Sequence, residues 1–192
     1  GVLLAFNLPA GIPWWIVVIG ALVAIGIGKM TYGGLGTNPF NPALTGRIFL
    51  LMAYPVEMTD WTTSIPDSLS GSTMLAEVKY NPALASELNF TEMFGGYMNG
   101  SMGEISALAL ILGGLYLLWR KVITWHIPVS ILLTMALFAM GYAIGFGGSL
   151  IYELPLFHLL AGGALLGAIY MATDYSTSPM THKGMIIYGV GI

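Results

Sequence analysis

Long apolar runs, separated by short polar segments rich in glycine and proline, dominate the pattern along the chain. A helix that crosses a bilayer needs about 20 mainly apolar residues. The pattern predicts an all-α fold, a polytopic integral membrane helical bundle. The predicted spans are 13–28, 105–119, 122–152 and 154–173, with one more ending before Pro9 and another opening at Gly184.

The apolar run at 41–54 is shorter than the others and contains Arg47. Its 14 residues would form a helix about 21 Å long, whereas the hydrocarbon core of a bilayer is about 30 Å thick. We therefore expect a tilted or half-depth helix that follows a broken loop. A long basic side chain in such a helix usually extends to the membrane interface, and we expect this of Arg47; the alternative is contact with a ligand.

Composition narrows the class of protein further. Hydrophobic residues make up 56% of the 192 residues and charged residues 8%, against about 25% charged in soluble domains. So few charges exclude a soluble globular domain. The net charge of −3 offers no basic footprint for nucleic acid, and the absence of cysteine excludes disulfides and thiol chemistry in this chain. Because the chain begins with Gly1 and stops in an apolar run, we interpret 1–192 as a single transmembrane domain, a fragment of a longer chain.

The basic residues predict the orientation in the membrane, because cytoplasmic loops are enriched in lysine and arginine. If each span crosses once, five of the six basic residues lie on one side, which we assign to the cytoplasm: Lys29, Arg47, Arg120, Lys121 and Lys183. Lys79 and eight of the nine acids then lie on the other side. The segment at about 55–103 becomes a long extracytoplasmic loop, and loops of that length are usually functional or disordered. Its aromatic residues argue against disorder.

Two polar, turn-rich segments, 33–43 and 172–181, interrupt the apolar pattern on the cytoplasmic side. Irregular backbone near membrane depth persists only where protein buries it or where it lines a cavity, and paired breaks are typical of inverted repeats with broken helices. Asn41 can cap the helix that begins at Pro42, or the amides of Asn38 and Asn41 can bind a polar ligand. Asp174 is either a solvated loop charge or cap, or a contact for a ligand or cation.

A further motif, Asp67-Ser68-Leu69-Ser70-Gly71-Ser72-Thr73, lies in the outer loop. Together with 33–43, 171–179 and 103–106 it resembles the RnfD/NqrB family, the membrane subunits of the Rnf complex and of the sodium-pumping NADH:quinone oxidoreductase. The flavinylation motif of that family reads Asp-x-x-Ser-Gly-Ala-Thr. Asp67, Ser70, Gly71 and Thr73 match it, and Ser72 replaces the usual alanine. The segment at 33–43 resembles the RnfD form more than the NqrB form.

The resemblance implies that Thr73 carries FMN through a phosphoester. A threonine hydroxyl is a poor nucleophile without a base, and the loop contains no histidine, so a separate flavin transferase is the implied agent. The resemblance also implies a multi-pass subunit in the bacterial inner cell membrane. It would exchange electrons with a second flavin-carrying subunit, within a complex of membrane and peripheral subunits that moves Na⁺ or H⁺. We expect no activity from this chain alone and assign no catalytic residue.

Family members are also associated with a second, noncovalent flavin, riboflavin. The paired broken segments could form its pocket, with amides and hydroxyls at the edge of the isoalloxazine. The candidate residues are Asn38, Asn41, Thr173, Asp174 and Thr177. The histidines are isolated, so no metal site is predicted.

Three alternatives remain from the sequence. Within the family, the chain could be an NqrB subunit. A passive solute channel or transporter with inverted repeats would fit the broken helices equally well. A purely structural anchor for partner subunits would leave the motif at 67–73 unexplained.

Overall fold

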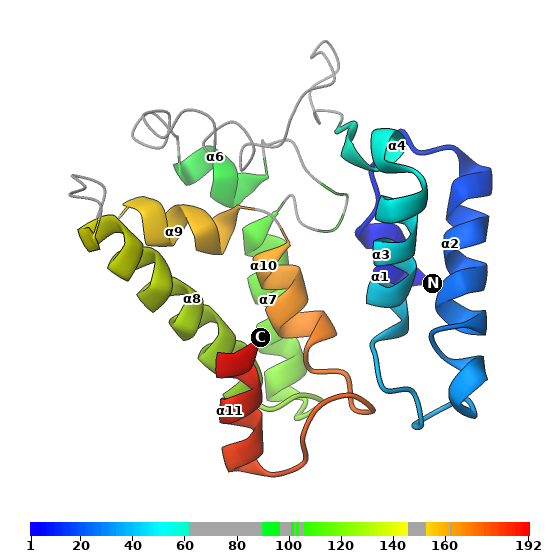
Figure 1. Cartoon of the computed structure of the whole chain (residues 1–192). Coiled ribbons are helices and arrows are strands. Elements are labelled where there is room, and N and C mark those ends of the chain that lie inside the picture. The colour runs from blue at the N-terminus through cyan, green and yellow to red at the C-terminus, as the bar shows by residue number, and fades with distance from the viewer. Residues whose placement is uncertain (62–89, 97–100, 102, 104–105, 146–152, 162) are drawn as a thin grey trace.

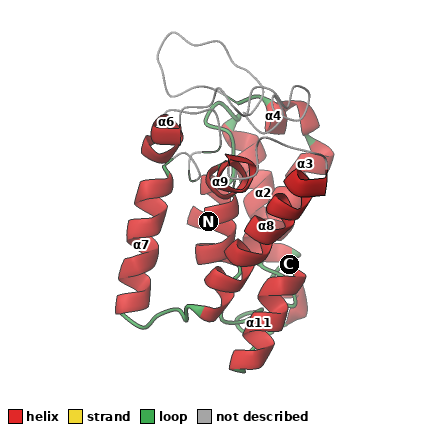
Figure 2. Cartoon of the chain, turned by 90° about the vertical axis from the view of Figure 1, so that its left-hand side faces the viewer, coloured by secondary structure: helices red, strands yellow, loops and turns green. Residues whose placement is uncertain are grey.

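The computed structural model describes residues 1–61, 90–96, 101, 103, 106–145, 153–161 and 163–192, and the regular elements of these residues are all helices (Figure 1, Figure 2). Two helical stretches, Trp14–Tyr32 and His126–Gly145, are long and apolar enough to cross a membrane. Large apolar side chains face outward, among them Leu22, Met52 and Phe138. Such a surface suits lipid or partner helices and not water. The fold is that of a helical membrane protein.

The first unit consists of α1 (Val2–Phe6), α2 (Trp14–Gly26), the short 3₁₀ helix η1 (Met30–Tyr32), α3 (Pro42–Ala53) and α4 (Pro55–Thr59). Helices α2 and α3 run antiparallel and side by side (Figure 1). Gly46 allows this close approach, since a Cβ there would lie 2.9 Å from both the Cβ of Ala24 and the carbonyl oxygen of Gly20. The 12 residues of α3 span about 18 Å, so the prediction of a short helix is confirmed.

The second unit consists of α6 (Phe90–Gly95), α7 (Ala107–Trp119), α8 (His126–Gly145), α9 (Glu153–Leu160), α10 (Ala164–Leu166), the π-helix η3 (Gly167–Met171) and α11 (His182–Gly191). Helix α11 packs against α8, and α9 also contacts α8. Helix α7 stands apart from α8 in both views (Figure 1, Figure 2).

The prediction of one continuous span at 154–173 is wrong. Helix α9 ends at Leu160, and α10 begins at Ala164 in a different direction (Figure 1). The sequence between them is Ala161-Gly162-Gly163. Each glycine destabilises a helix by about 1 kcal/mol relative to alanine, so little helix stability is lost when the helix ends at this pair of glycines.

The two units meet at the second half of this broken run. Leu166 and Met171 are buried in the same apolar cluster as Leu4, Ile16 and Leu50 of the first unit. The connections η1–α3, α7–α8 and η3–α11 all lie at one end of the molecule (Figure 1). We call this the basic end, because Lys29, just before η1, Arg120 and Lys121, in the α7–α8 connection, and Lys183, in the first turn of α11, all belong to it. Helix α4, with Glu57, lies at the opposite end.

Candidate functional site

The motif residues of the outer loop lie outside the described residues. This applies to Asp67, Ser70, Gly71, Ser72 and Thr73. The prediction that Thr73 carries a flavin therefore remains a prediction.

The two broken segments meet at a cavity of about 820 Å³, which we call the central cavity. Its walls come from the start of α3, from α8, from α10 with η3, and from α11. Asn41 and Thr177 both line it, although 136 positions separate them in the sequence. Ligand pockets are typically about 300–1,000 Å³, so this cavity has the size of a cofactor site.

Asn41 has two roles at this cavity. Its Oδ1 accepts hydrogen bonds from the backbone N–H groups of Ala43 at 2.9 Å and Leu44 at 3.4 Å, which confirms the predicted helix cap. Its Nδ2 donates to the carbonyl oxygen of Met171 at 3.2 Å. One amide thus caps α3 and also ties the first unit to the π-helix.

The other three candidate residues do not line the central cavity. Asn38 is buried, and its Nδ2 donates to the carbonyl oxygen of Phe40 at 3.0 Å. Asp174 accepts hydrogen bonds from Ser176 at 2.8 Å and Thr177 at 3.3 Å, within its own turn. Thr173 faces a smaller cavity of about 320 Å³ on the other side of this turn. Of the five predicted residues, Asn41 and Thr177 therefore lie together at the central cavity. Asn38 and Asp174 instead make hydrogen bonds within their own loops.

Small residues form one wall of the central cavity: Gly163, Ala164, Gly167 and Ala168. A Cβ built on Gly167 would have no atom of another element within 4 Å, so the space beside it is open. The π-helix η3 begins at Gly167, and single turns of π-helix are frequent at functional sites. The spacing of these four small residues, two pairs four positions apart, is a signal in the sequence that could have indicated this wall.

A second polar cluster joins the units behind the cavity. The Nη1 atom of Arg47 donates to Oδ1 of Asn7 at 2.6 Å, and Nδ2 of Asn7 donates to the sulfur of Met171 at 3.4 Å. Asn7 is only 1% exposed. The guanidinium of Arg47 is thus tied to a buried partner next to α1, and the expectation that it extends to the membrane interface stays a prediction. Sequence reasoning missed Asn7, and its one signal is an amide in an otherwise apolar run before Pro9.

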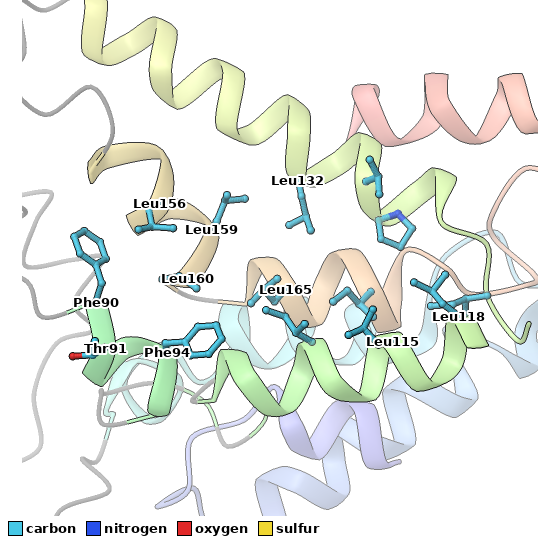
Figure 3. A pocket seen from close by; sticks show the side chains of 16 residues that line it. Phe90, Thr91, Phe94, Leu115, Leu118, Leu132, Leu156, Leu159, Leu160 and Leu165 are labelled. Carbon is cyan, nitrogen blue, oxygen red and sulfur yellow. The ribbon is translucent and has the colours of Figure 1, made fainter. Parts of the chain in front are cut away.

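A third feature is an apolar cavity of about 730 Å³ between α7 and α8, which we call the α7–α8 slot (Figure 3). Helices α6 and α9 border it at one end, where Phe90 and Phe94 lie, and Leu118 lies at the other end (Figure 3). Among the described residues that line it, Thr91 is the one with a polar side chain. The slot therefore offers almost no hydrogen bonds, in contrast to the central cavity.

Comparison with known proteins assigns the family. The model of the NQR2, RnfD, RnfE family matches residues 1–192. The chain belongs to this family. The membership confirms the resemblance that the motifs indicated, and it covers the whole of this sequence.

Three relatives within this family are named as the D subunits of ion-translocating complexes. The chain is 48% identical over 196 residues to the D subunit of the Na(+)-translocating ferredoxin:NAD(+) oxidoreductase complex of Acetobacterium woodii. It is 42% identical over 201 residues to the D subunit of the proton-translocating ferredoxin:NAD(+) oxidoreductase complex of Clostridium ljungdahlii. It is 40% identical over 226 residues to the D subunit of the ion-translocating oxidoreductase complex of Stutzerimonas stutzeri. All of this chain is matched in each case, but it spans only 58%, 60% and 62% of these relatives.

Proposed function

We propose that this chain is the membrane domain of the RnfD subunit of an Rnf-type complex, which relays electrons through covalent FMN while Na⁺ or H⁺ crosses the membrane. The observation that carries the proposal is the motif Asp67-Ser68-Leu69-Ser70-Gly71-Ser72-Thr73 in a chain that matches the family over its full length. The names of the relatives include both sodium and proton translocation, so either ion suits the proposal.

In this proposal Thr73 holds FMN by a phosphoester on its side-chain oxygen, and a separate flavin transferase makes the bond. A bound flavin supplies one-electron and two-electron transfer, which the side chains of this chain lack. Asp67, Ser70, Gly71 and Ser72 form the rest of the recognition sequence. A covalent bond keeps the group from diffusing into the outer water. Other subunits of the complex, one of them carrying another flavin, would exchange electrons with it.

The test is in-gel flavin fluorescence of the full-length chain, produced with its flavin transferase and separated under denaturing conditions. We expect a fluorescent band for the wild type and none for Thr73→Ala, because the alanine has no oxygen for the phosphoester. Thr63→Ala, in the same loop but outside the motif, is the matched control and should stay fluorescent. A fluorescent Thr73→Ala band would contradict the proposal, and peptide mass mapping would locate the modified residue.

We also propose that the central cavity holds the noncovalent flavin, riboflavin. Three properties of the cavity suit the isoalloxazine ring: its volume of about 820 Å³, the open space beside Gly167, and the polar groups of Asn41 and Thr177 in its lining. The Tyr188 side chain of α11 lines the cavity as well and interacts with Thr177. These groups would hold the polar edge of the ring, while Ile131 and the small-residue wall exclude water from its face.

Gly167→Leu tests this second proposal, because an added Cβ at Gly167 meets no atom within 4 Å and the leucine side chain would extend into the open space. We expect flavin released by acid from the purified full-length chain to fall from about one per chain to near zero, while flavin bound to Thr73 stays. Gly26→Leu, also a helical glycine whose added Cβ meets no atom within 4 Å, is the control, since it does not line the central cavity. Equal release from the two variants would contradict the assignment.

The remaining parts of the proposal concern the membrane. We infer a multi-pass arrangement in the bacterial inner membrane, with the basic end in the cytoplasm and the segment at about 55–103 outside. Helices α2 and α3 enclose one broken connection, and η3 and α11 enclose the other, and both connections lie at the same end (Figure 1). If an internal repeat related the pair α2–α3 to the pair η3–α11, both pairs would have the same orientation in the membrane. Inverted repeats would therefore have to relate other parts of the full-length protein.

A further inference from the structure

The α7–α8 slot requires an occupant without polar groups along most of its length. Leu132, Leu159 and Leu165 point into its middle, and Phe90 and Phe94 lie at the end near α6 (Figure 3). An apolar occupant gains about 25 cal/mol for each Å² of apolar surface that it removes from water. A polar ligand would lose its hydrogen bonds to water in this slot and find almost none to replace them.

The size of the slot suits a narrow chain. Its volume of about 730 Å³ lies within the range of about 300–1,000 Å³ that is usual for a site that holds one small ligand. A flexible hydrocarbon chain is narrow enough to fill such a slot along its length.

Positive charge marks the end of the slot near the basic end of the molecule. Leu118 and Ile123 line the slot, and the turn between them contains Arg120 and Lys121. Both basic side chains are exposed. Asp174, the acid of this end, is held by Ser176 and Thr177 in its own turn. The two basic residues are therefore available to an anionic group that lies at the mouth of the slot.

The same turn carries the aromatic side chain expected at a membrane–water interface. Trp119 is 78% exposed, and tryptophan is enriched at the level of the lipid headgroups. Basic residues near the membrane surface attract anionic lipids, and basic sites between transmembrane helices bind their headgroups. Charge, aromatic anchor and apolar slot thus follow one another in the order of a phospholipid: phosphate, interface, acyl chain.

We propose that the α7–α8 slot binds an acyl chain of an anionic phospholipid whose phosphate is held by Arg120 and Lys121. This lipid belongs to the surrounding bilayer and is independent of any flavin. It fills the gap between α7 and α8, which have few direct contacts, and so fixes the position of α7 against the rest of the second unit.

The experiment uses the full-length protein in vesicles of phosphatidylcholine that contain a phosphatidylglycerol with a diazirine on one acyl chain. After illumination, peptide mass mapping locates the cross-links. We expect labels on α7 and α8 at the slot, and about tenfold less labelling in the double variant Arg120→Gln, Lys121→Gln, because both headgroup contacts are lost. Lys29→Gln removes a basic residue of the same end, away from the slot, and should leave the labelling unchanged.

Two further measurements test the same occupant. In the wild-type protein, phosphatidylcholine with the same diazirine should label the slot about tenfold less than phosphatidylglycerol does. This comparison does not depend on the folding of a variant. Leu115→Trp narrows the slot and should reduce labelling by either lipid. Equal labelling by the two lipids, or labelling that the Arg120→Gln, Lys121→Gln variant does not reduce, would overturn the proposal. Labels on the outer faces of α7 and α8 without labels on the residues that line the slot would overturn it too, since the slot would then not hold this lipid.

Discussion

At the scale of single residues, the hydrogen bond between Arg47 and Asn7 joins a charged group to a buried amide. A guanidinium in an apolar helix needs a partner, because an unpaired buried polar group costs several kcal/mol at membrane depth. Asn7 provides this partner through Oδ1, and its Nδ2 donates to the carbonyl oxygen of Leu3 at 2.7 Å. The short helix α1 is thereby held to α3 at a buried position.

Asn7→Ala should lower the free energy of unfolding by about 1–3 kcal/mol, because it leaves Arg47 without its acceptor and removes the contact with Met171. Thermal unfolding of the full-length protein in detergent measures this change. Thr59→Ala is the control, since the hydroxyl of Thr59 is exposed and its hydrogen bonds, to Pro55 and Val56, stay within α4. Equal unfolding temperatures for Asn7→Ala and Thr59→Ala would show that the buried contact contributes no stability.

The sequence predicted some of these residue roles and not others, for a physical reason. The cap by Asn41 is a contact between neighbours in the chain, so the pattern Asn-Pro before an apolar run was sufficient. The bond from Arg47 to Asn7 joins residues 40 positions apart, and the bond from Asn41 to Met171 joins residues 130 positions apart. Such contacts depend on how the helices pack, which no local pattern contains.

At the scale of the elements, α8 and α11 pack closely where Gly189 faces Ser130. A Cβ at Gly189 would overlap Oγ of Ser130, and it would also lie 2.9 Å from its Cβ. Small residues at helix contacts let two backbones pack tightly in a membrane. This contact holds α11 in place, and Tyr188 of α11 lines the central cavity beside it.

Gly189→Ala should therefore destabilise the protein and reduce the binding of the noncovalent flavin, because α11 must move away from α8. The cost should be about 1–3 kcal/mol in the free energy of unfolding. Ser130→Gly removes the opposing side chain, so the double variant should recover part of the loss, a coupling that a double-mutant cycle measures. Gly141→Ala, where an added Cβ meets no atom within 4 Å, is the matched control within α8. Strictly additive effects of Gly189→Ala and Ser130→Gly would contradict the packing argument.

The elements themselves were predictable to different degrees. Composition and run length indicated the positions of α2, α3, α7 and α8, because each is one apolar run with clear ends. The break between α9 and α10 was not predicted, since the run from 154 to 173 carries no formal charge and two glycines alone do not show whether a membrane helix bends. The π-helix followed from no pattern. The wall of the central cavity therefore came from the structure, while its polar edge came in part from the sequence.

At the scale of the whole molecule, charge and fold agree on two different ends. The described basic residues outside the helices, Lys29, Arg120 and Lys121, gather at one end, and Glu57 and Asp60 lie at or next to α4 at the other (Figure 1). From this separation and the positive-inside rule we propose that the basic end faces the cytoplasm.

The absence of cysteine from this sequence makes the orientation directly testable with single cysteines. Thr59→Cys is exposed at the end of α4, and Tyr175→Cys, at a position that is 82% exposed, lies in the turn between η3 and α11. A maleimide that cannot cross membranes should label Thr59→Cys in intact spheroplasts, because this end faces outward. It should label Tyr175→Cys only after the membrane is permeabilised. The full-length protein needs a background in which any cysteines outside this segment are replaced, and that parent should remain unlabelled. Labelling of Tyr175→Cys from outside, with Thr59→Cys protected, would invert the molecule and place the loop that carries Thr73 in the cytoplasm.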